Sequence, residues 1–561
     1  MGRRRGESRL RFNCFLLKNG LDDPQQALRE PYRRGGAAEM AKLRNKDKAP
    51  HGATAYLLAN TERHPSWAVR LAELFEGLED TRNLSNRLII FLPVEERIFA
   101  ACFGYGSSAL DWSCVEPNFG LRVAARAMSP NAMSELRSRR FDVSARTQQI
   151  QVPGGASLRD LDVELEGEFV SRLVGKMEPE GILFGDQELD LGMDVGGVLV
   201  ASDSIAFQSE VDLEKVVRVL RRFLWLVDST DTREEFRFVD ALKPLRADDG
   251  RVRMLDAALA AYLFDWKDER SDYRRNIRDV LISFAPPDSI AIADIDGVEL
   301  SRGNDTLAVA DISYEALRET LRRFRSRYSV DDLKKIKVIA YNHAGEPMAQ
   351  AFSLKNWLVM ETVLDSERFI LTMGRWFSLS EEFTKKLDSD LSMIRDLTAE
   401  LNLPPWPATQ DGGTKHHEGD YNESIKGPEW VVLDKVRVPS QGTMVEACDL
   451  FHVKGHLVHL KRWTRSQTLS HLLAQGSISA ELMKLDSDYL QNFVKEVEKR
   501  SIAHKAEAEK APRSVVYAIG APEGKSIPGD LPTFSKVNLR HHCKRIRSMG
   551  VTPGLAKVTM V

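Results

Sequence analysis

Cysteine is scarce in this sequence, with five residues among 561, and no two of them form a CxxC pair. Zinc sites built on cysteine need such closely spaced pairs, and a disulfide framework needs an even number of cysteines at short intervals. The sequence therefore excludes a zinc knuckle and a disulfide scaffold. Scattered thiols are typical of a reducing compartment, so we expect a cytoplasmic protein.

Long apolar runs are also missing, although a membrane-spanning helix needs about 20 consecutive apolar residues. The amino-terminal segment MGRRRGESRLRFNCFLLK begins with basic residues, but its apolar part extends only from Phe12 to Leu17 and contains Asn13. A charged residue, Lys18, follows at once. We expect neither a signal peptide nor a membrane anchor, and no membrane partner.

A large excess of one charge is absent as well, because the formal net charge is only −3. A nucleic-acid partner would therefore have to be held by local basic patches rather than by the field of the whole chain. The sequence does have 43% hydrophobic and 29% charged residues, which is typical of globular domains with sizeable cores.

The pattern of helices and strands predicts a mixed α/β (α+β), multidomain protein. We expect an amino-terminal α/β domain of unknown role over residues 1–175. A middle α/β domain over residues 176–401 ends in a long helix from residue 380 to 401, with Ser378 or Ser380 as its cap. Residues 402–420 are rich in proline and glycine and predict a linker, and residues 421–561 form the carboxy-terminal domain.

The carboxy-terminal domain has the most informative order of elements. A short helix or turn begins at Tyr421, and the predicted order is α-β-β-β-α-β followed by α-β. The predicted strands are Trp430–Val438, Thr443–Phe451, His456–Trp463, Ser514–Gly520 and Leu555–Met560. The predicted helices after the third strand are Ser466–Met483 and Ser535–Met549.

Candidate catalytic residues lie on the second and third of these strands. Asp449 is near the end of the second strand, whereas His459 and Lys461 are two residues apart on the third and share one face of it. Glu423 lies in the first helix. Glu446 and Asp449 point to opposite faces if their strand is regular. A plain cross-strand ion pair between Asp449 and Lys461 is the structural alternative.

This arrangement resembles the PD-(D/E)xK nuclease core, and the resemblance covers residues 421–561. In that family an aspartate ends the second strand, a (D/E)xK triplet lies on the third, and an acidic residue of the first helix often joins them. The resemblance implies catalytic roles for Asp449 and Lys461 and a metal-ligand role for Asp449 and Glu423. His459 stands in the acidic position of the triplet, where it would act as a metal ligand or a general base.

The cofactor implied by this resemblance is Mg²⁺ or Mn²⁺, because hard divalent cations bind carboxylate oxygens. Imidazole is a poor ligand for magnesium and suits manganese, zinc or iron better. His459 therefore bears on which metal would bind and on whether the site is active.

Basic and polar residues near these strands predict contacts with nucleic acid. Residues 511–561 contain eight Lys or Arg and two Asp or Glu, in a chain that is acidic overall. Such asymmetry is typical of nucleic-acid enzymes, although a solvated basic helix face also accounts for it. The expected nucleic-acid-binding residues are Arg462, Arg465, His471, Gln475, Lys536 and Arg540.

Short segments along most of the chain resemble a sporadically distributed bacterial family of unknown function. They include RFNCFLLKN, FGYGSSALDW, VEPNFGLRVA, ILTMGRWFSLSEEF, EACDLF, HLVHLKRW and SHLLAQG. Patchy occurrence of this kind is similar to that of restriction and phage-defence genes.

We therefore expect a metal-dependent nuclease or nuclease-like effector that acts on nucleic acid in phage defence, with DNA rather than RNA as its partner. Two other classes stay open. One is a catalytically inactive nucleic-acid-binding protein, in which His459 marks the loss of a metal ligand. The other is a scaffold or interaction protein in which Asp449 and Lys461 only pair. Homo-oligomerisation is open too.

Overall fold

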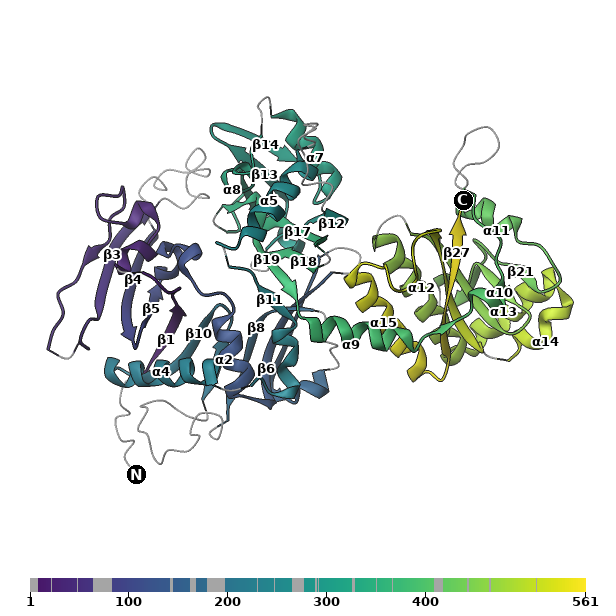
Figure 1. Ribbon diagram of the computed structural model, residues 1–561, viewed down its shortest axis with the longest axis horizontal. Coiled ribbons are helices and arrows are strands. Elements are labelled where there is room, and N and C mark those ends of the chain that lie inside the picture. The colour runs from purple at the N-terminus through teal and green to yellow at the C-terminus, as the bar shows by residue number, and fades with distance from the viewer. Residues whose placement is uncertain are drawn as a thin grey trace.

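The computed structural model shows three bodies along the chain (Figure 1). It describes residues 9–561 except for 22, 48, 64–82, 142–144, 162–167, 179–196, 230, 247, 265–276, 288–289, 291, 325–327, 350, 366, 408–416, 441–442, 464–465 and 511. The expected mixed α/β, multidomain class is confirmed.

The amino-terminal body contains a ten-stranded antiparallel sheet of order β2-β3-β4-β5-β1-β10-β9-β8-β6-β7. Helices α2 (Phe119–Ala127) and α4 (Leu213–Ser229) share its apolar core. The strands are β1 Arg9–Leu16, β2 Ala41–Lys42, β3 Thr54–Arg63, β4 Asn83–Val94, β5 Arg97–Gly104, β6 Met128–Phe141, β7 Ala145–Ala156, β8 Phe169–Met177, β9 Val198–Ala201 and β10 Ser204–Glu210.

This body continues past the boundary that the sequence predicts at residue 175, which falls inside β8. Strand β10 pairs with β1, with Asn13 opposite Ala206. The core extends along α4 and as far as Val239. The sequence pattern locates individual strands but carries little information on their partners, so it does not show that the first and tenth strands are neighbours.

The middle body contains a five-stranded sheet of order β11-β19-β18-β17-β12 and a four-stranded sheet of order β14-β13-β15-β16, which share one core. The strands are β11 Leu242–Pro244, β12 Ile277–Phe284, β13 Gly297–Arg302, β14 Asp305–Val309, β15 Lys337–Tyr341, β16 Phe352–Ser353, β17 Leu358–Leu364, β18 Glu367–Thr372 and β19 Arg375–Leu379. The helices are α5 Gly250–Leu263, α7 Tyr314–Arg323 and α8 Asp332–Lys335.

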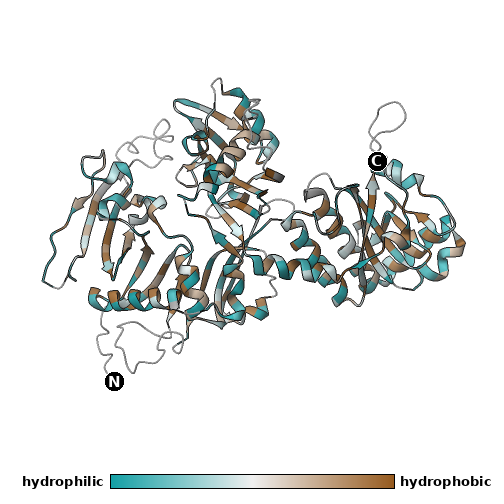
Figure 2. Cartoon of the chain, in the orientation of Figure 1, coloured by the Kyte–Doolittle hydropathy of each residue, from teal (hydrophilic) through white to brown (hydrophobic). Residues whose placement is uncertain are grey.

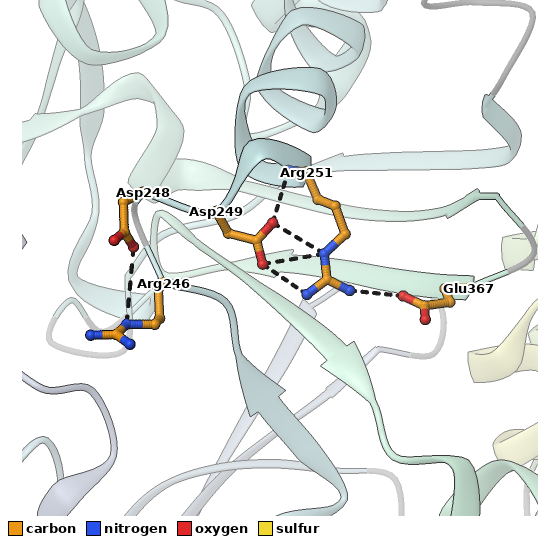
Figure 3. A network of polar contacts seen from close by, with 5 residues as sticks. All are labelled: Arg246, Asp248, Asp249, Arg251 and Glu367. Carbon is orange, nitrogen blue, oxygen red and sulfur yellow. Dashed lines mark hydrogen bonds and ion pairs between the residues drawn. The ribbon is translucent and has the colours of Figure 1, made fainter.

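A polar network fixes the start of α5 beside β18 (Figure 3). Asp249 caps the helix, because its Oδ1 accepts a hydrogen bond of 2.9 Å from the backbone N–H of Arg251. The guanidinium of Arg251 bonds back to Asp249 at 2.7 Å and reaches Glu367 at 2.9 Å. Arg246 and Asp248 lie 4.0 Å apart nearby. Most of these groups are exposed, so each ion pair stabilises the fold only slightly.

The carboxy-terminal body contains a six-stranded mixed sheet of order β20-β27-β26-β25-β24-β21. Strand β25 is antiparallel to β24 and parallel to β26. The strands are β20 Arg395–Asp396, β21 Trp430–Val432, β24 Leu450–His452, β25 His456–Arg462, β26 Ser514–Pro522 and β27 Thr552–Met560, with β22 Arg437–Ser440 and β23 Thr443–Glu446 in a separate ribbon. The helices are α9 Glu381–Ser392, α10 Thr398–Leu401, α11 Glu418–Ser424, α12 Ser466–Leu485, α13 Ser487–Arg500, α14 Lys505–Ala508 and α15 Thr533–Ser548.

The segment expected as one helix over 380–401 is broken. Ser380 caps α9 as predicted, since its Oγ accepts a hydrogen bond of 3.2 Å from the backbone N–H of Phe383. The helix then stops at Ser392, and β20 pairs with β27. Residues of α9 such as Leu387 belong to the carboxy-terminal core. This body therefore includes α9, β20 and α10 in addition to residues 421–561.

The first part of the expected linker packs on the same body. Trp406 is fully buried, and its ring stacks on that of Tyr421 with 4.4 Å between the ring centroids. Residues 408–416, which include His416, lie outside the described residues. Figure 2 shows hydrophobic residues concentrated on the strands of the three bodies. Among the residues that the structure describes, no helix is long and apolar enough to cross a membrane.

Candidate metal centre

Three carboxylates converge at one end of the carboxy-terminal sheet. Asp434 follows β21, Glu446 ends β23 and Asp449 immediately precedes β24. Each offers an oxygen within 4.8 Å of the oxygens offered by the other two, and this is the one group of its kind within the described part of the chain. We call Asp434, Glu446 and Asp449 the carboxylate cluster.

The cluster exists because two strands expected to be continuous are interrupted. The segment Trp430–Val438 divides into β21 and β22 at a turn where Lys435 has a φ of 61°. The segment Thr443–Phe451 divides into β23 and β24, and β23 pairs with β22 instead of the main sheet. Glu446 and Asp449 were expected on opposite faces only if their strand is regular, and the structure does not meet this condition. The break between β23 and β24 brings both side chains to one place.

Asp449 is the most buried member of the cluster, with 8% of its surface exposed. Its Oδ2 accepts a hydrogen bond of 2.7 Å from the backbone N–H of Leu460 on β25. The pKa of Asp449 is raised to about 8, chiefly by burial. The hydrogen bond from Leu460 opposes this rise, and the charges of Glu446, Glu418 and Asp434 contribute to it. A cation at this point would relieve that electrostatic cost.

Glu446 is held from two sides. Its Oε1 accepts a hydrogen bond of 2.8 Å from the backbone N–H of Lys435, and its Oε2 lies 3.5 Å from Nε2 of Gln475 on α12. The first contact comes from the turn after β21 and the second from the helix after β25. Glu446 is thus the member of the cluster through which α12 touches the site.

A fourth carboxylate and a lysine adjoin the cluster. Nζ of Lys461 on β25 lies 2.8 Å from Oε1 of Glu418, the first residue of α11. Burial raises the pKa of Glu418, and the charges of Asp434 and Glu446 also raise it. The hydrogen bond and the charge of Lys461 lower this pKa. A Cβ on Gly419 would lie 3.3 Å from Oδ2 of Asp434, so the start of α11 lies directly against the cluster.

The donor set fits a hard divalent cation. Magnesium and manganese bind carboxylate oxygens, often with water completing the coordination. Asp434, Glu446 and Asp449 would hold such a cation, with Glu418 and Lys461 beside it. Lys461 carries the positive charge that can face a phosphate oxygen.

Two predicted metal ligands lie elsewhere. Glu423 is exposed on α11, and Glu418, five residues earlier, is the helix carboxylate beside Lys461. His459 is 2% exposed, and its ring lies 6.5 Å from that of Tyr517. Burial alone lowers the pKa of His459 to about 3, and its Nε2 has no hydrogen-bond partner among the residues that the structure describes. His459 is a core residue in this structure and does not belong to the carboxylate cluster.

The residues expected to bind nucleic acid are divided among several places. Gln475 reaches the cluster, whereas His471 is exposed on the same helix and Arg465 lies outside the described residues. Arg462 donates a hydrogen bond of 2.5 Å to the carbonyl oxygen of Pro407, and its guanidinium lies 4.8 Å from the Trp406 ring. Arg462 therefore stabilises the position of Trp406 and Pro407 before α11.

Lys536 and Arg540 do not form the open basic surface that their sequence predicts. Both are less than 10% exposed on α15. Nζ of Lys536 lies 2.6 Å from Asp388, and a guanidinium nitrogen of Arg540 lies 3.3 Å from Asp390. Both acids belong to α9, so these pairs join two helices. The sequence-based prediction overlooked α9 as the partner because it assigned that helix to another domain.

Asp434 and Glu418 are the site residues that sequence reasoning missed. Asp434 stood inside a predicted strand, and its signal was the pair Asp434-Lys435, which interrupts an apolar run. Glu418 stood in the predicted linker, three residues before Tyr421. Acidic residues are common in both settings, so neither position is distinctive without the fold.

The fold and the cluster define a multidomain α/β protein with a candidate metal centre in its last body. The family model described as "Family of unknown function (DUF6119)" matches residues 12–559. The chain belongs to this family, which confirms the expectation of a family of unknown function. Searches of curated proteins and of solved structures gave no match.

Proposed function

We propose that the carboxy-terminal body is a divalent-metal-dependent phosphodiesterase that acts on nucleic acid. The observation that carries this proposal is the carboxylate cluster beside Lys461, on a sheet with the strand order β27-β26-β25-β24-β21. The elements α11, β21, β24, β25, α12 and β26 have the α-β-β-β-α-β order of the PD-(D/E)xK nuclease core, and this likeness supports the assignment.

The proposed ligands differ from those predicted from the sequence. Asp449 keeps its role, and Asp434 and Glu446 take the places expected for Glu423 and His459. When bound, Mg²⁺ or Mn²⁺ would polarise a phosphate and lower the pKa of attacking water. Lys461 would stabilise negative charge on a phosphate oxygen, and Glu418 holds its ammonium in position at 2.8 Å.

We propose DNA as the substrate and phage defence in the cytoplasm as the setting. The patchy bacterial family that the sequence resembles supports the setting. All five cysteines are free thiols, which accords with a reducing compartment. The nucleic-acid-binding role of Gln475 and His471 remains part of this proposal.

Cleavage of plasmid DNA, single-stranded DNA and RNA in Mg²⁺ or Mn²⁺ tests the proposal. Lys461→Ala should reduce the cleavage rate about 10²- to 10³-fold, because one stabilising contact to developing charge is lost. Lys454→Ala is the matched control, since Lys454 lies in the turn before β25 and pairs with Glu400 at 3.1 Å. Equal activity of Lys461→Ala and wild type would overturn the assignment. Metal binding and retention of nucleic acid without cleavage would favour the inactive binding protein.

A further inference from the structure

The three bodies meet at the beginning of α15. Glu361 on β17 is 1% exposed, and its two carboxylate oxygens accept hydrogen bonds from the backbone N–H groups of Thr533 at 2.5 Å and Phe534 at 3.3 Å. Arg368 on β18 lies 3.4 Å from Glu361 and donates to the carbonyl oxygen of Leu531 at 3.1 Å. We call this set of contacts the α15 joint.

An apolar contact reinforces the α15 joint. Phe534 belongs to a small core with Phe169 of β8 and Phe377 of β19, whose ring centroids are 5.1 Å apart. All three bodies therefore contribute to this core, the middle body with several residues and each of the others with one phenylalanine. A carboxylate of the middle body satisfies backbone donors that the helix itself leaves unpaired.

Helix α15 also lies along both α9 and α12. Lys536 and Arg540 pair with Asp388 and Asp390 of α9, the helix that follows β19 directly. Figure 1 shows α9 and α15 on the side of the carboxy-terminal body that faces the other two bodies. The two helices therefore connect these bodies through packed contacts and through the chain itself.

The contact with α12 leads to the carboxylate cluster. Nδ1 of His542 on α15 lies 2.8 Å from Oγ of Ser477 on α12, and Arg545 pairs with Glu481 one turn further on. Ser477 is two residues from Gln475, whose Nε2 lies 3.5 Å from Oε2 of Glu446. These side-chain contacts, together with the backbones of α15 and α12, link Glu361 to the cluster.

A cavity of about 900 Å³ lies between the two helices and the amino-terminal body, where the segment 157–160, Glu234, Glu235 and Phe238 line it. Its lining includes Asp160 and Glu234 on the amino-terminal side and Lys386 and Arg547 on the helix side.

We propose that α15 transmits the position of the middle body to the carboxylate cluster, and that the α15 joint regulates metal binding there. This inference rests on the proposed function, because the regulated site is the proposed metal centre. A change at Glu361 shifts α15, and α12 shifts with it because the two helices are packed together. Gln475 on α12 then moves Glu446, which changes the arrangement of the metal ligands.

The test is the variant Glu361→Gln in the full chain, with Mn²⁺ as the probe. We expect the affinity for Mn²⁺ to fall at least about fivefold and amide hydrogen exchange to rise in α12 around Gln475. Asp256→Asn is the matched control, because Asp256 is another buried carboxylate of the middle body and pairs with Lys355 at 2.5 Å. It should change neither quantity.

Unchanged Mn²⁺ affinity, with faster exchange confined to β17 and the first turn of α15, would overturn the inference. If wild type binds no Mn²⁺, the proposed function fails, and exchange in α12 alone then decides whether the joint is coupled to that helix. If Glu361→Gln does not fold, Phe534→Leu perturbs the same joint without removing a charge and is judged by the same two measurements.

Discussion

Asp449 makes the carboxylate cluster sensitive to pH. Its pKa is about 8 in the folded protein, above the ordinary 3.8, chiefly because the side chain is buried. Between pH 3.8 and about pH 8, Asp449 holds a proton in the native state that it has released in the unfolded state. The contribution of Asp449 to stability is therefore fully present below about pH 4 and is lost as the pH rises through 8.

Asp449→Asn should remove this pH dependence while keeping an oxygen to accept the hydrogen bond from Leu460. In the presence of a chelator, the variant should gain stability relative to wild type as the pH rises, by up to about 1.4 kcal/mol per pH unit between 4 and 8. Urea unfolding at pH 5 and pH 8 measures the difference. Glu423→Gln, an exposed acid, is the control, and a difference that does not depend on pH would contradict this account.

His459 has the opposite dependence. Burial lowers its pKa to about 3 from the ordinary 6.5, so its contribution to stability is present above pH 6.5 and is lost as the pH falls towards 3. His459→Leu should therefore lose less stability than wild type between pH 6.5 and 4, and should retain metal binding. Loss of Mn²⁺ affinity in this variant would support the original prediction that His459 is a metal ligand.

The interrupted strands β21–β22 and β23–β24 create the site, and this is where prediction from sequence reached its limit. Much of the order of helices and strands in the last body was predictable, because apolar runs, turns and helix caps are local signals, but α13 and α14 were not among the predicted elements. The position of Asp449 beside the third predicted strand was predictable as well. Asp434 and Glu418 were not, because their role depends on a left-handed turn at Lys435 and on how α11 docks. The partners of Lys536 and Arg540 depend on tertiary packing, which spacing does not encode.

The close packing of α12 against β26 gives a prediction about this helix. A Cβ on Gly476 would lie 2.5 Å from Cε1 of Tyr517, whose own ring is fully buried. Gly476→Ala should therefore destabilise the protein by about 1–3 kcal/mol through overpacking. Gly524→Ala is the control, because no heavy atom lies within 4 Å of the added Cβ. Equal stability of the two variants in thermal unfolding would show that α12 does not pack closely against Tyr517 of β26.

The extent of the carboxy-terminal body also gives a prediction. Phe383, Leu387 and Leu391 of α9 are buried in its core, and Trp406 packs on its other face. A fragment of residues 378–561 should be several kcal/mol more stable than one of residues 418–561, because each large apolar side chain contributes about 1.5–3 kcal/mol. Both fragments lack Glu361, so the comparison is matched at the α15 joint. Equal stability of the two fragments in urea unfolding would mean that the domain boundary lies in the predicted linker, residues 402–420.

The three bodies and the α15 joint give the protein an arrangement in which recognition and chemistry would lie in different parts of one chain. The amino-terminal and middle bodies hold no carboxylate group comparable to the cluster among the residues described. Contacts with α15, and α9 directly after β19, connect these bodies to the carboxy-terminal body. The account therefore depends most on whether the carboxylate cluster binds a cation.

Calorimetric titration of the full chain with Mn²⁺ tests that claim most directly. Wild type and Glu423→Gln should bind the ion alike, whereas Asp434→Asn should bind it at least about tenfold more weakly because one ligand is lost. Equal binding by all three proteins would place the ion elsewhere. Absence of binding to wild type would leave Lys461 and Glu418 as a structural ion pair and would contradict the proposed metal centre.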